Sequence, residues 1–216
     1  CWVTSSAAGT SKLMQTEQRP IVILGAARSG TKFLRDTLGA SSEISIVPYD
    51  VNYIWRTGNE ACRHDEISPD LCSEALAARI RKELYRAARE SGTRTTGRLL
   101  EKTVSNTLRV EFVSRVFPDA DLVHLIRDGR EVVASSLRQW GLPIDQSYLL
   151  GKLRAFSVRN YKYAFWYAVN RIRGTTGPDG RVAIWGVRYA GIEEDLRTQS
   201  LAEICARQWL ASVTSV

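Results

Sequence analysis

The feature that most constrains the fold is a run of four apolar residues that leads into a glycine-bearing loop. Residues 21–24 are Ile-Val-Ile-Leu, and the loop that follows is Gly25-Ala26-Ala27-Arg28-Ser29-Gly30-Thr31-Lys32. Successive apolar residues predict a strand buried on both faces, as in a parallel sheet. Helical spacing of apolar residues follows over residues 30–39. We therefore expect strand, loop and helix, in which backbone N–H groups and the helix dipole attract an anion.

Strands and helices alternate along the rest of the chain. We expect strands at residues 21–24, 44–47, 98–102, 121–126 and 182–185, and helices at residues 30–39, 74–91, 106–117, 128–139, 147–173 and 201–212. This order predicts an α/β fold in three layers, with a mostly parallel sheet flanked by helices. Residues 20–216 are expected to form a single domain after a flexible lead over residues 1–19. Asp128 and Glu131 have the spacing of a capping box.

Charge and composition narrow the class of protein. Basic residues outnumber acidic ones by 30 to 23, and all but six of the basic residues are Arg. This excess suits bidentate binding of phosphate or sulfate, although a solvated Arg surface has the same composition. The sequence contains no long Lys/Arg run typical of nucleic-acid binding and no apolar stretch of about 18 residues typical of a membrane span. The four Cys and two His fit no zinc motif. The sparse cysteines are typical of a reducing compartment, and a cytoplasmic protein is expected.

Two segments are candidates for binding phosphate groups. The spacing from Gly25 to Gly30 is that of a Walker A loop, but Thr and Lys follow in the wrong order for that motif. The strand near residue 126 ends in Arg127, which suits a second phosphate better than Mg²⁺. Ser135 lies eight residues further on, roughly 10 Å along the next helix. Arg127 and Ser135 are therefore expected to face one crevice at the carboxyl edge of the sheet.

The two segments together resemble the sulfotransferases that use 3′-phosphoadenosine 5′-phosphosulfate. The matching stretches are RSGTKFL at residues 28–34 and LIRDGREVVASS at residues 125–136, within a resemblance that covers residues 20–212. The resemblance implies that the 5′-phosphosulfate is bound by Arg28, Ser29, Gly30, Thr31 and Lys32. It implies that Arg127 and Ser135 hold the 3′-phosphate. Weaker matches at residues 48–56, 101–103 and 185–189 resemble a bacterial branch linked to polysaccharide sulfation. This resemblance implies a hydroxyl acceptor of the carbohydrate class.

The chain departs from the family pattern in two places. Residues 102–106 lack the His that cytosolic members use in catalysis. No basic, glycine-containing loop occurs before Val216, where the family has one over the 3′-phosphate. Either the chain is truncated at its C-terminus, or it clamps the nucleotide differently.

In-line sulfuryl transfer needs cations for the developing negative charge and a base for the acceptor hydroxyl. Arg28 and Lys32 are the expected cations, and no metal is expected. Asp50 is ranked first as the base because some relatives carry a carboxylate about 20 residues after the phosphate loop. Glu101 is ranked second, and His64 and Asp65 third. A turn Asp and a salt-bridged Glu are the structural alternatives for Asp50 and Glu101.

Other interpretations remain open at this point. A P-loop kinase or another nucleotide phosphotransferase would need Mg²⁺, and a non-catalytic anion-binding domain would fit the net charge of +7. The acceptor cleft is predicted to be lined by Asn52, Trp55, Arg56 and Asn59. Aromatic residues between 161 and 167 are expected to pack in the core, with a sugar platform as the alternative. The sequence indicates no oligomeric state.

Overall fold

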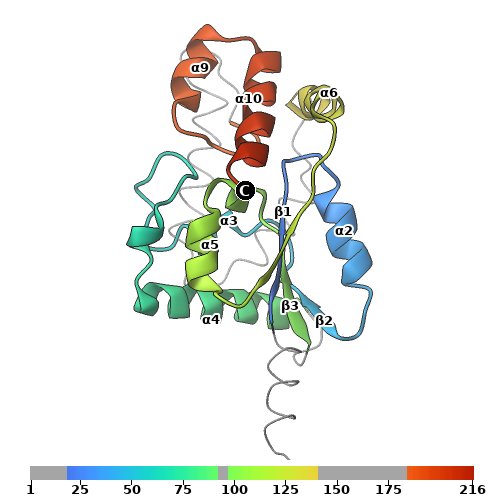
Figure 1. Ribbon diagram of the computed structural model, residues 1–216, viewed down its shortest axis with the longest axis vertical. Coiled ribbons are helices and arrows are strands. Elements are labelled where there is room, and N and C mark those ends of the chain that lie inside the picture. The colour runs from blue at the N-terminus through green and yellow to red at the C-terminus, as the bar shows by residue number, and fades with distance from the viewer. Residues whose placement is uncertain (1–18, 92–96, 141–183) are drawn as a thin grey trace, which may run out of the picture.

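A parallel sheet lies at the centre of the protein (Figure 1). The computed structural model describes residues 19–91, 97–140 and 184–216. Its strands are β1 (Ile21–Leu24), β2 (Ile44–Ile46), β3 (Arg98–Glu101) and β4 (Asp121–His124), in the order β2-β3-β1-β4. Every strand pair is parallel, and Val22 of β1 lies between Glu101 and Leu122 of its neighbours. The predicted α/β fold with a parallel sheet is confirmed.

Helices cover both faces of this sheet. They are α2 (Thr31–Leu38), α3 (Asn52–Trp55), α4 (Glu74–Glu90), α5 (Val110–Val116), α6 (Gly129–Trp140), α9 (Ile192–Thr198) and α10 (Leu201–Thr214), with 3₁₀ helices η1 (Pro69–Leu71) and η2 (Val104–Leu108). In Figure 1, α2 lies on one side of the sheet and α4 and α5 lie on the other.

The alternation of side chains along β1 builds the three layers. Val22 and Leu24 pack into a core with residues of α4 and α5, such as Ile80 and Phe112. Ile21 and Ile23 point to the opposite face. There the core is closed by α2, through side chains that include Leu34 and Leu38. β1 is therefore buried on both faces, as its four apolar residues predict.

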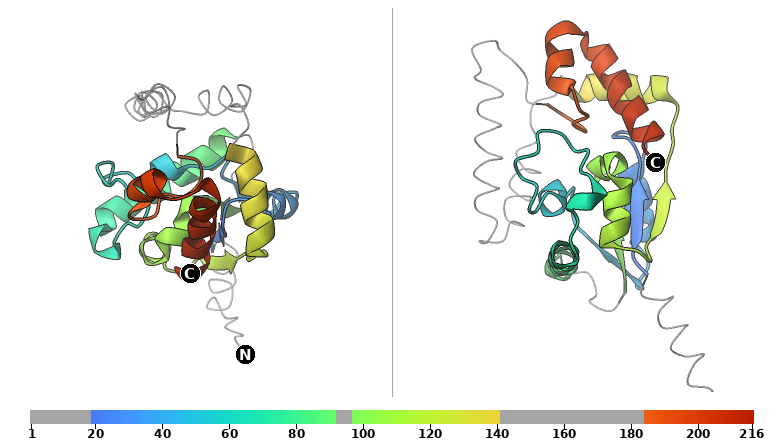
Figure 2. Two further views of the ribbon diagram at one scale, coloured as in Figure 1. Left: turned by 90° about the horizontal axis from the view of Figure 1, so that it is seen from above. Right: turned by 60° about the vertical axis from the view of Figure 1, so that its left-hand side comes forward.

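The carboxyl ends of the strands point toward a group of C-terminal elements. Figures 1 and 2 show α6, α9 and α10 beyond this end of the sheet. Leu108 of η2 packs there with Val187, Tyr189 and Ile204 in a separate cluster of buried residues. The C-terminal helices therefore lie next to the sheet edge where ligands bind in open α/β proteins.

Several element boundaries differ from the sequence expectation. The expected helix at 106–117 is split into η2 and α5, and α9 was not expected, because seven residues are too few to show a helical period. Residues 184 and 185 of the expected fifth strand are not in a strand, while residues 182–183 and the helix at 147–173 lie outside the described residues. The lead over residues 1–18 also lies outside them, and the single domain stays a prediction.

The N-terminus of α6 has only half of the expected capping box. The Asp128 carboxylate accepts hydrogen bonds from the backbone N–H groups of Arg130 and Glu131. The Glu131 carboxylate instead pairs with Arg127. Asp128 therefore caps the helix, while Glu131 forms an ion pair with Arg127.

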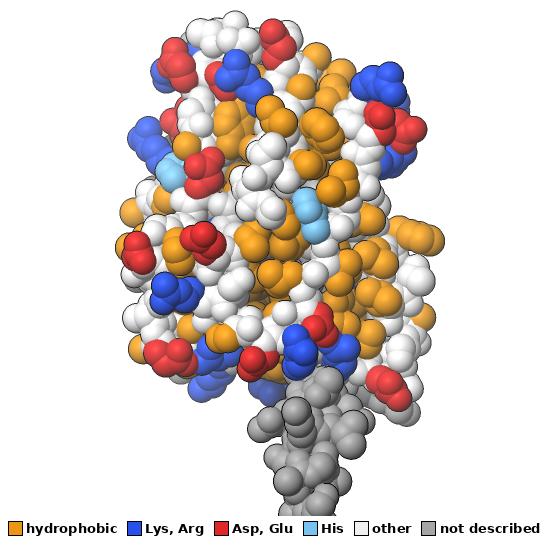
Figure 3. Space-filling view, viewed as in Figure 1, with side chains coloured by type: hydrophobic (Ala, Val, Ile, Leu, Met, Phe, Trp, Pro, Cys, Tyr) orange, Lys and Arg blue, Asp and Glu red, His pale blue; other side chains and the backbone are white. Residues whose placement is uncertain are grey.

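The surface around β4 is unusually apolar. Figure 3 shows hydrophobic side chains along the middle of this face, with most of the charged side chains around them. Leu122 and Ile126 are 40% and 59% exposed, and β4 is an edge strand of the described sheet.

In the described part of the chain, no helix has the length and hydrophobicity needed to cross a membrane.

Candidate functional site

The loop between β1 and α2 makes a close turn that only glycine permits at its first position. A Cβ atom on Gly25 would lie 2.7 Å from Thr31 Cγ2 and 2.8 Å from the carbonyl oxygen of Leu125. Arg28 and Gly30 both have left-handed backbone conformations, with φ of 71° and 96°. The loop therefore folds back tightly over the end of β1, and the chain enters α2 immediately afterwards.

This loop presents groups that suit an anion. No side chain of the described residues caps the N-terminus of α2, and its first turn contains no acidic residue, so no carboxylate of that turn opposes its N–H groups and dipole. Ser29 is buried, and its hydroxyl oxygen has no hydrogen-bond partner among the described residues. Lys32 is exposed on the same first turn. Together these groups fit the phosphate or phosphosulfate end of a ligand.

The second predicted segment contacts the loop directly. Arg28 Nε donates a hydrogen bond to Ser135 Oγ at 3.0 Å, and Arg127 Nη1 donates to the carbonyl oxygen of Arg28 at 3.2 Å. Arg127 follows β4, and Ser135 lies in α6, so strand pairing and helix packing bring them to the loop. The expected common location of Arg28, Arg127 and Ser135 is thus seen, while their roles stay predictions.

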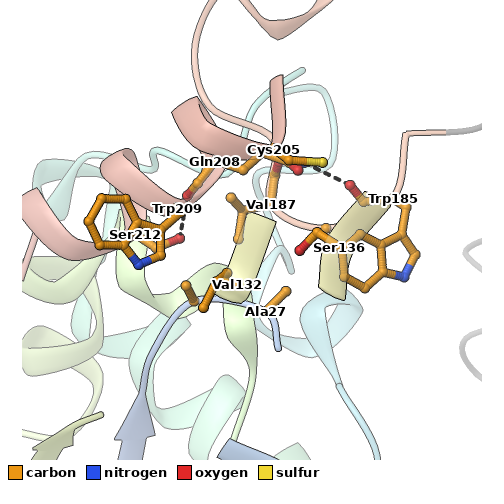
Figure 4. Close-up of a pocket in the computed structure, with 11 residues that line it drawn as sticks. Ala27, Val132, Ser136, Trp185, Val187, Cys205, Gln208, Trp209 and Ser212 are labelled. Carbon is orange, nitrogen blue, oxygen red and sulfur yellow. Dashed lines mark hydrogen bonds between the residues drawn. The ribbon is translucent and has the colours of Figure 1, made fainter. Parts of the chain in front are cut away.

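Helix α10 packs over the other side of the loop. Trp209 Nε1 donates a hydrogen bond to the carbonyl oxygen of Arg127 at 3.2 Å. Gln208 Nε2 donates to the carbonyl oxygens of Trp185 and Val187 at 2.7 and 2.9 Å. Figure 4 shows the remaining space, a cavity of about 10 Å³ between α6, α10 and the loop. It has room for about one water molecule, so a nucleotide would have to lie toward Arg28 and Arg127.

Asp50 and Lys102 form a second charged group, beyond the ends of β2 and β3. Asp50 Oδ2 accepts a hydrogen bond from the backbone N–H of Val104 at 3.1 Å, and Lys102 Nζ lies 3.8 Å from the same oxygen. Asp50 Oδ1 accepts from the N–H of Asn52 at 3.3 Å. The Asp50 side chain is 26% exposed, so solvent reaches it. Sequence reasoning missed Lys102 as a site residue, although its place at the end of a buried strand was a usable signal.

The order of the strands places these charged groups in a row. Asp50 follows β2, Lys102 follows β3, the loop with Arg28 follows β1, and Arg127 follows β4. Carboxyl ends of parallel strands meet at one edge, with neighbouring strands about 4.8 Å apart. The edge therefore carries a carboxylate at one end, then an ammonium group, a phosphate-type loop and a guanidinium group.

Glu101 lies beneath this row rather than in it. Its side chain is completely buried, and Oε2 accepts a hydrogen bond from Asn106 Nδ2 at 3.0 Å. Burial raises the pKa of Glu101 to about 7, against the lowering influence of Thr103 and Trp55. A carboxyl group without exposed surface does not reach an acceptor in this conformation, so the geometry favours Asp50 over Glu101 as the base.

Asp65 is the centre of a buried network of polar groups. Its side chain is 1% exposed and is held by four hydrogen bonds, from Asn52 Nδ2, Arg56 Nη1, Ser105 Oγ and the backbone N–H of Arg188. Burial alone would raise the pKa of Asp65, but the Arg109 guanidinium and these hydrogen bonds hold the pKa below its ordinary value. Asp65 is thus a structural carboxylate.

Two of the residues expected to line the acceptor cleft are buried instead. Trp55 has no exposed surface, and Arg56 is 9% exposed. Arg56 also donates to the carbonyl oxygens of Cys62 and His64. The expectation for these two residues is therefore wrong. Trp55 packs in the core against Phe117, and Arg56 holds the irregular segment between α3 and η1 in place.

The fold and the charged edge define a parallel α/β protein in which a phosphate-type loop lies beside further charged side chains. The described residues contain no cluster of three or more His, Cys, Asp or Glu side chains suited to a metal ion. The sequence profile of the sulfotransferase family matches residues 20–206, and the chain belongs to this family.

One curated relative adds a more distant similarity. An uncharacterized protein of Aquifex aeolicus (strain VF5) is 29% identical over an alignment of 132 residues that covers 56% of this chain. The chain spans only 17% of that relative's length. This match therefore shows that the two proteins share a similar segment, and it gives no information about activity.

Proposed function

We propose that this protein transfers a sulfuryl group from 3′-phosphoadenosine 5′-phosphosulfate to a hydroxyl group of an acceptor, for which a carbohydrate is the favoured class. The observation that carries the proposal is the row of charged groups along one sheet edge, which runs from Asp50 to Arg127 in strand order. Membership of the sulfotransferase family supports the type of reaction. The row is long enough to engage both ends of a nucleotide that carries two separate phosphate groups.

The donor would be held from both of its phosphate ends. The uncapped N-terminus of α2, the unpaired Ser29 hydroxyl and Gly30 suit the 5′-phosphosulfate. Arg127 and Ser135 both contact Arg28 and suit the 3′-phosphate. Arg is the residue that best matches a phosphate bidentately, which supports this direction of binding.

The transfer step would be an in-line displacement at sulfur. The S–O bond to the nucleotide breaks while a new S–O bond forms to the acceptor oxygen, whose proton passes to the Asp50 carboxylate. Arg28 and Lys32 would stabilise the charge that develops on the leaving phosphate oxygen. Lys102, 3.8 Å from Asp50, would orient that carboxylate toward the acceptor. No group other than these side chains is needed to balance the step.

The proposed compartment, the cytoplasm, is supported by the thiol groups. Among the described residues Cys62, Cys72 and Cys205 are all free. Unpaired cysteines are typical of a reducing environment, which supports the expectation of a cytoplasmic protein.

Ligand-induced stabilisation tests the donor class. The product nucleotide, 3′-phosphoadenosine 5′-phosphate, should raise the thermal midpoint, since a ligand at 100 times its dissociation constant adds about 2.7 kcal/mol of stability. ATP with Mg²⁺ should add much less, because it lacks the 3′-phosphate.

The same assay distinguishes the main alternative. A larger shift with ATP and Mg²⁺ than with the 3′-phosphorylated nucleotide would favour a kinase and overturn the proposal. Transfer of a labelled sulfuryl group to a panel of saccharides, phenols and lipids then identifies the acceptor class. Absence of transfer to saccharides would contradict the carbohydrate acceptor and leave the proposed reaction type unaffected.

A further inference from the structure

The guanidinium group of Arg127 is paired with a carboxylate of the protein itself, that of Glu131. Arg127 Nε and Nη2 both donate to Oε2 of Glu131, at 2.8 and 2.6 Å. Glu131 lies one helical turn further along, in the first turn of α6. The Nε and Nη2 edge of an Arg side chain is also an edge that can bind a phosphate through two hydrogen bonds.

The other contacts of Arg127 leave little freedom for a second arrangement. Arg127 Nη1 donates to the carbonyl oxygen of Arg28, so the guanidinium is oriented by the loop and by Glu131 together. A phosphate that used the Nε and Nη2 edge would have to replace the Glu131 carboxylate or share the guanidinium with it. Sharing places two negative groups side by side, which is unfavourable.

The ion pair is accessible enough for such an exchange. The side chains of Arg127 and Glu131 are 45% and 60% exposed, so Glu131 can swing into solvent without disturbing the core. Exposed ion pairs contribute little stability, and replacing this one costs the fold little. Removal of the carboxylate should therefore change ligand binding far more than it changes stability.

We propose that Glu131 is an internal competitor for the 3′-phosphate, which weakens the hold of Arg127 on the donor and on the product nucleotide. This inference rests on the proposed function. When the nucleotide leaves, the carboxylate returns to Arg127 and restores the arrangement seen in the structure. Glu131 thereby lowers the affinity for nucleotides with a 3′-phosphate. The affinity for a nucleotide without this group does not depend on Glu131.

Calorimetric titration of Glu131→Gln tests the inference. We expect 3′-phosphoadenosine 5′-phosphate to bind about 3- to 10-fold more tightly to this variant than to wild type, because Gln keeps the size of Glu without its charge. Adenosine 5′-phosphate, which lacks the 3′-phosphate, should bind both proteins equally. The titrations are made at one ionic strength, since screening alters these affinities.

Glu111→Gln is the matched control. Glu111 is exposed in the first turn of α5 and takes no part in the site, so this variant makes the same change in net charge at a distance. It should leave both affinities unchanged. Equal or weaker binding of the 3′-phosphorylated nucleotide by Glu131→Gln would overturn the inference and leave the proposed function intact. If wild type itself binds that nucleotide no better than adenosine 5′-phosphate, the proposed function fails as well.

Discussion

Asp50 is the residue on which the proposed chemistry most depends. Its carboxylate is partly exposed and faces Lys102, whereas Glu101 is buried beneath the site. We expect Asp50→Asn to lower turnover by about 10²–10⁴, the usual contribution of a general base, without weakening binding of the donor. Turnover at saturating donor and calorimetric titration of the product nucleotide measure the two effects separately.

Asp36→Asn is the control for this variant. Asp36 is half exposed on α2, and its one ionic partner among the described residues is its neighbour Arg35, so its loss should leave turnover unchanged. Wild-type turnover in Asp50→Asn would remove Asp50 from the mechanism. Glu101→Gln would then be the variant to measure.

Glu101 should make the stability of the protein depend on pH near neutrality. Burial raises the pKa of Glu101 to about 7, above the value of about 4.3 in an unfolded chain. The buried carboxyl group is therefore tolerated below about pH 4.3, and stability is lost as the pH rises from there through about 7. The loss is on the order of 3 kcal/mol.

Urea unfolding between about pH 5 and pH 9 measures this effect. Glu101→Gln stays neutral throughout, so its free energy of unfolding should vary less with pH than that of wild type. Parallel pH profiles for the two proteins would show that Glu101 keeps an ordinary pKa in the folded state.

At the scale of elements, the tight connection between β1 and α2 is the part most sensitive to substitution. A methyl group on Gly25 would lie closer than 3 Å to Thr31 and to the backbone of Leu125. We expect Gly25→Ala to lower the free energy of unfolding by about 1–3 kcal/mol and to weaken binding of the product nucleotide. Chemical denaturation and calorimetric titration measure the two quantities.

Gly191→Ala provides the comparison at another turn. Gly191 has a φ of 92°, but a Cβ atom there would meet no atom within 4 Å. Its cost is backbone strain alone, about 1–2 kcal/mol, and nucleotide binding should be unaffected. Equal nucleotide affinity in both variants would mean that the shape of the loop does not matter for binding.

At the scale of the whole molecule, Asp65 joins segments that are far apart in the sequence. Its carboxylate connects α3, η2 and the segment at residue 188, and it lies beside the buried guanidinium groups of Arg56 and Arg109. Asp65→Asn would leave buried cations without their anion. We expect it to cost about 3–5 kcal/mol in the free energy of unfolding, against almost nothing for the exposed Asp36→Asn.

The pH dependence of this loss has a definite sign. The pKa of Asp65 is lowered in the folded protein, so its stabilisation is present above the unfolded value of about 3.9. It is lost as the pH falls further, through the folded-state pKa. The difference between wild type and Asp65→Asn in urea unfolding should therefore be constant near neutral pH and shrink in acid. A difference that grows in acid would contradict the assignment.

The sequence by itself determined the parts of the protein that depend on neighbouring residues. The buried strand at residues 21–24 and the long helix α4 follow from runs and periods of apolar side chains. The phosphate-type loop follows from the spacing of Gly25 and Gly30 between a predicted strand and a predicted helix. Arg127 and Ser135 were placed near this loop because carboxyl ends of parallel strands share an edge.

Only the tertiary structure decided which side chains meet. Lys102 lies beside Asp50, and Arg28 bonds to Ser135, although these partners are far apart in the sequence. The burial of Glu101 likewise depends on helices packed over the sheet. Local patterns report hydrophobicity along one segment, whereas contacts and desolvation arise from the packing of several segments. Packing therefore decides that the Asp50 carboxylate is accessible and that the Glu101 carboxyl group is buried.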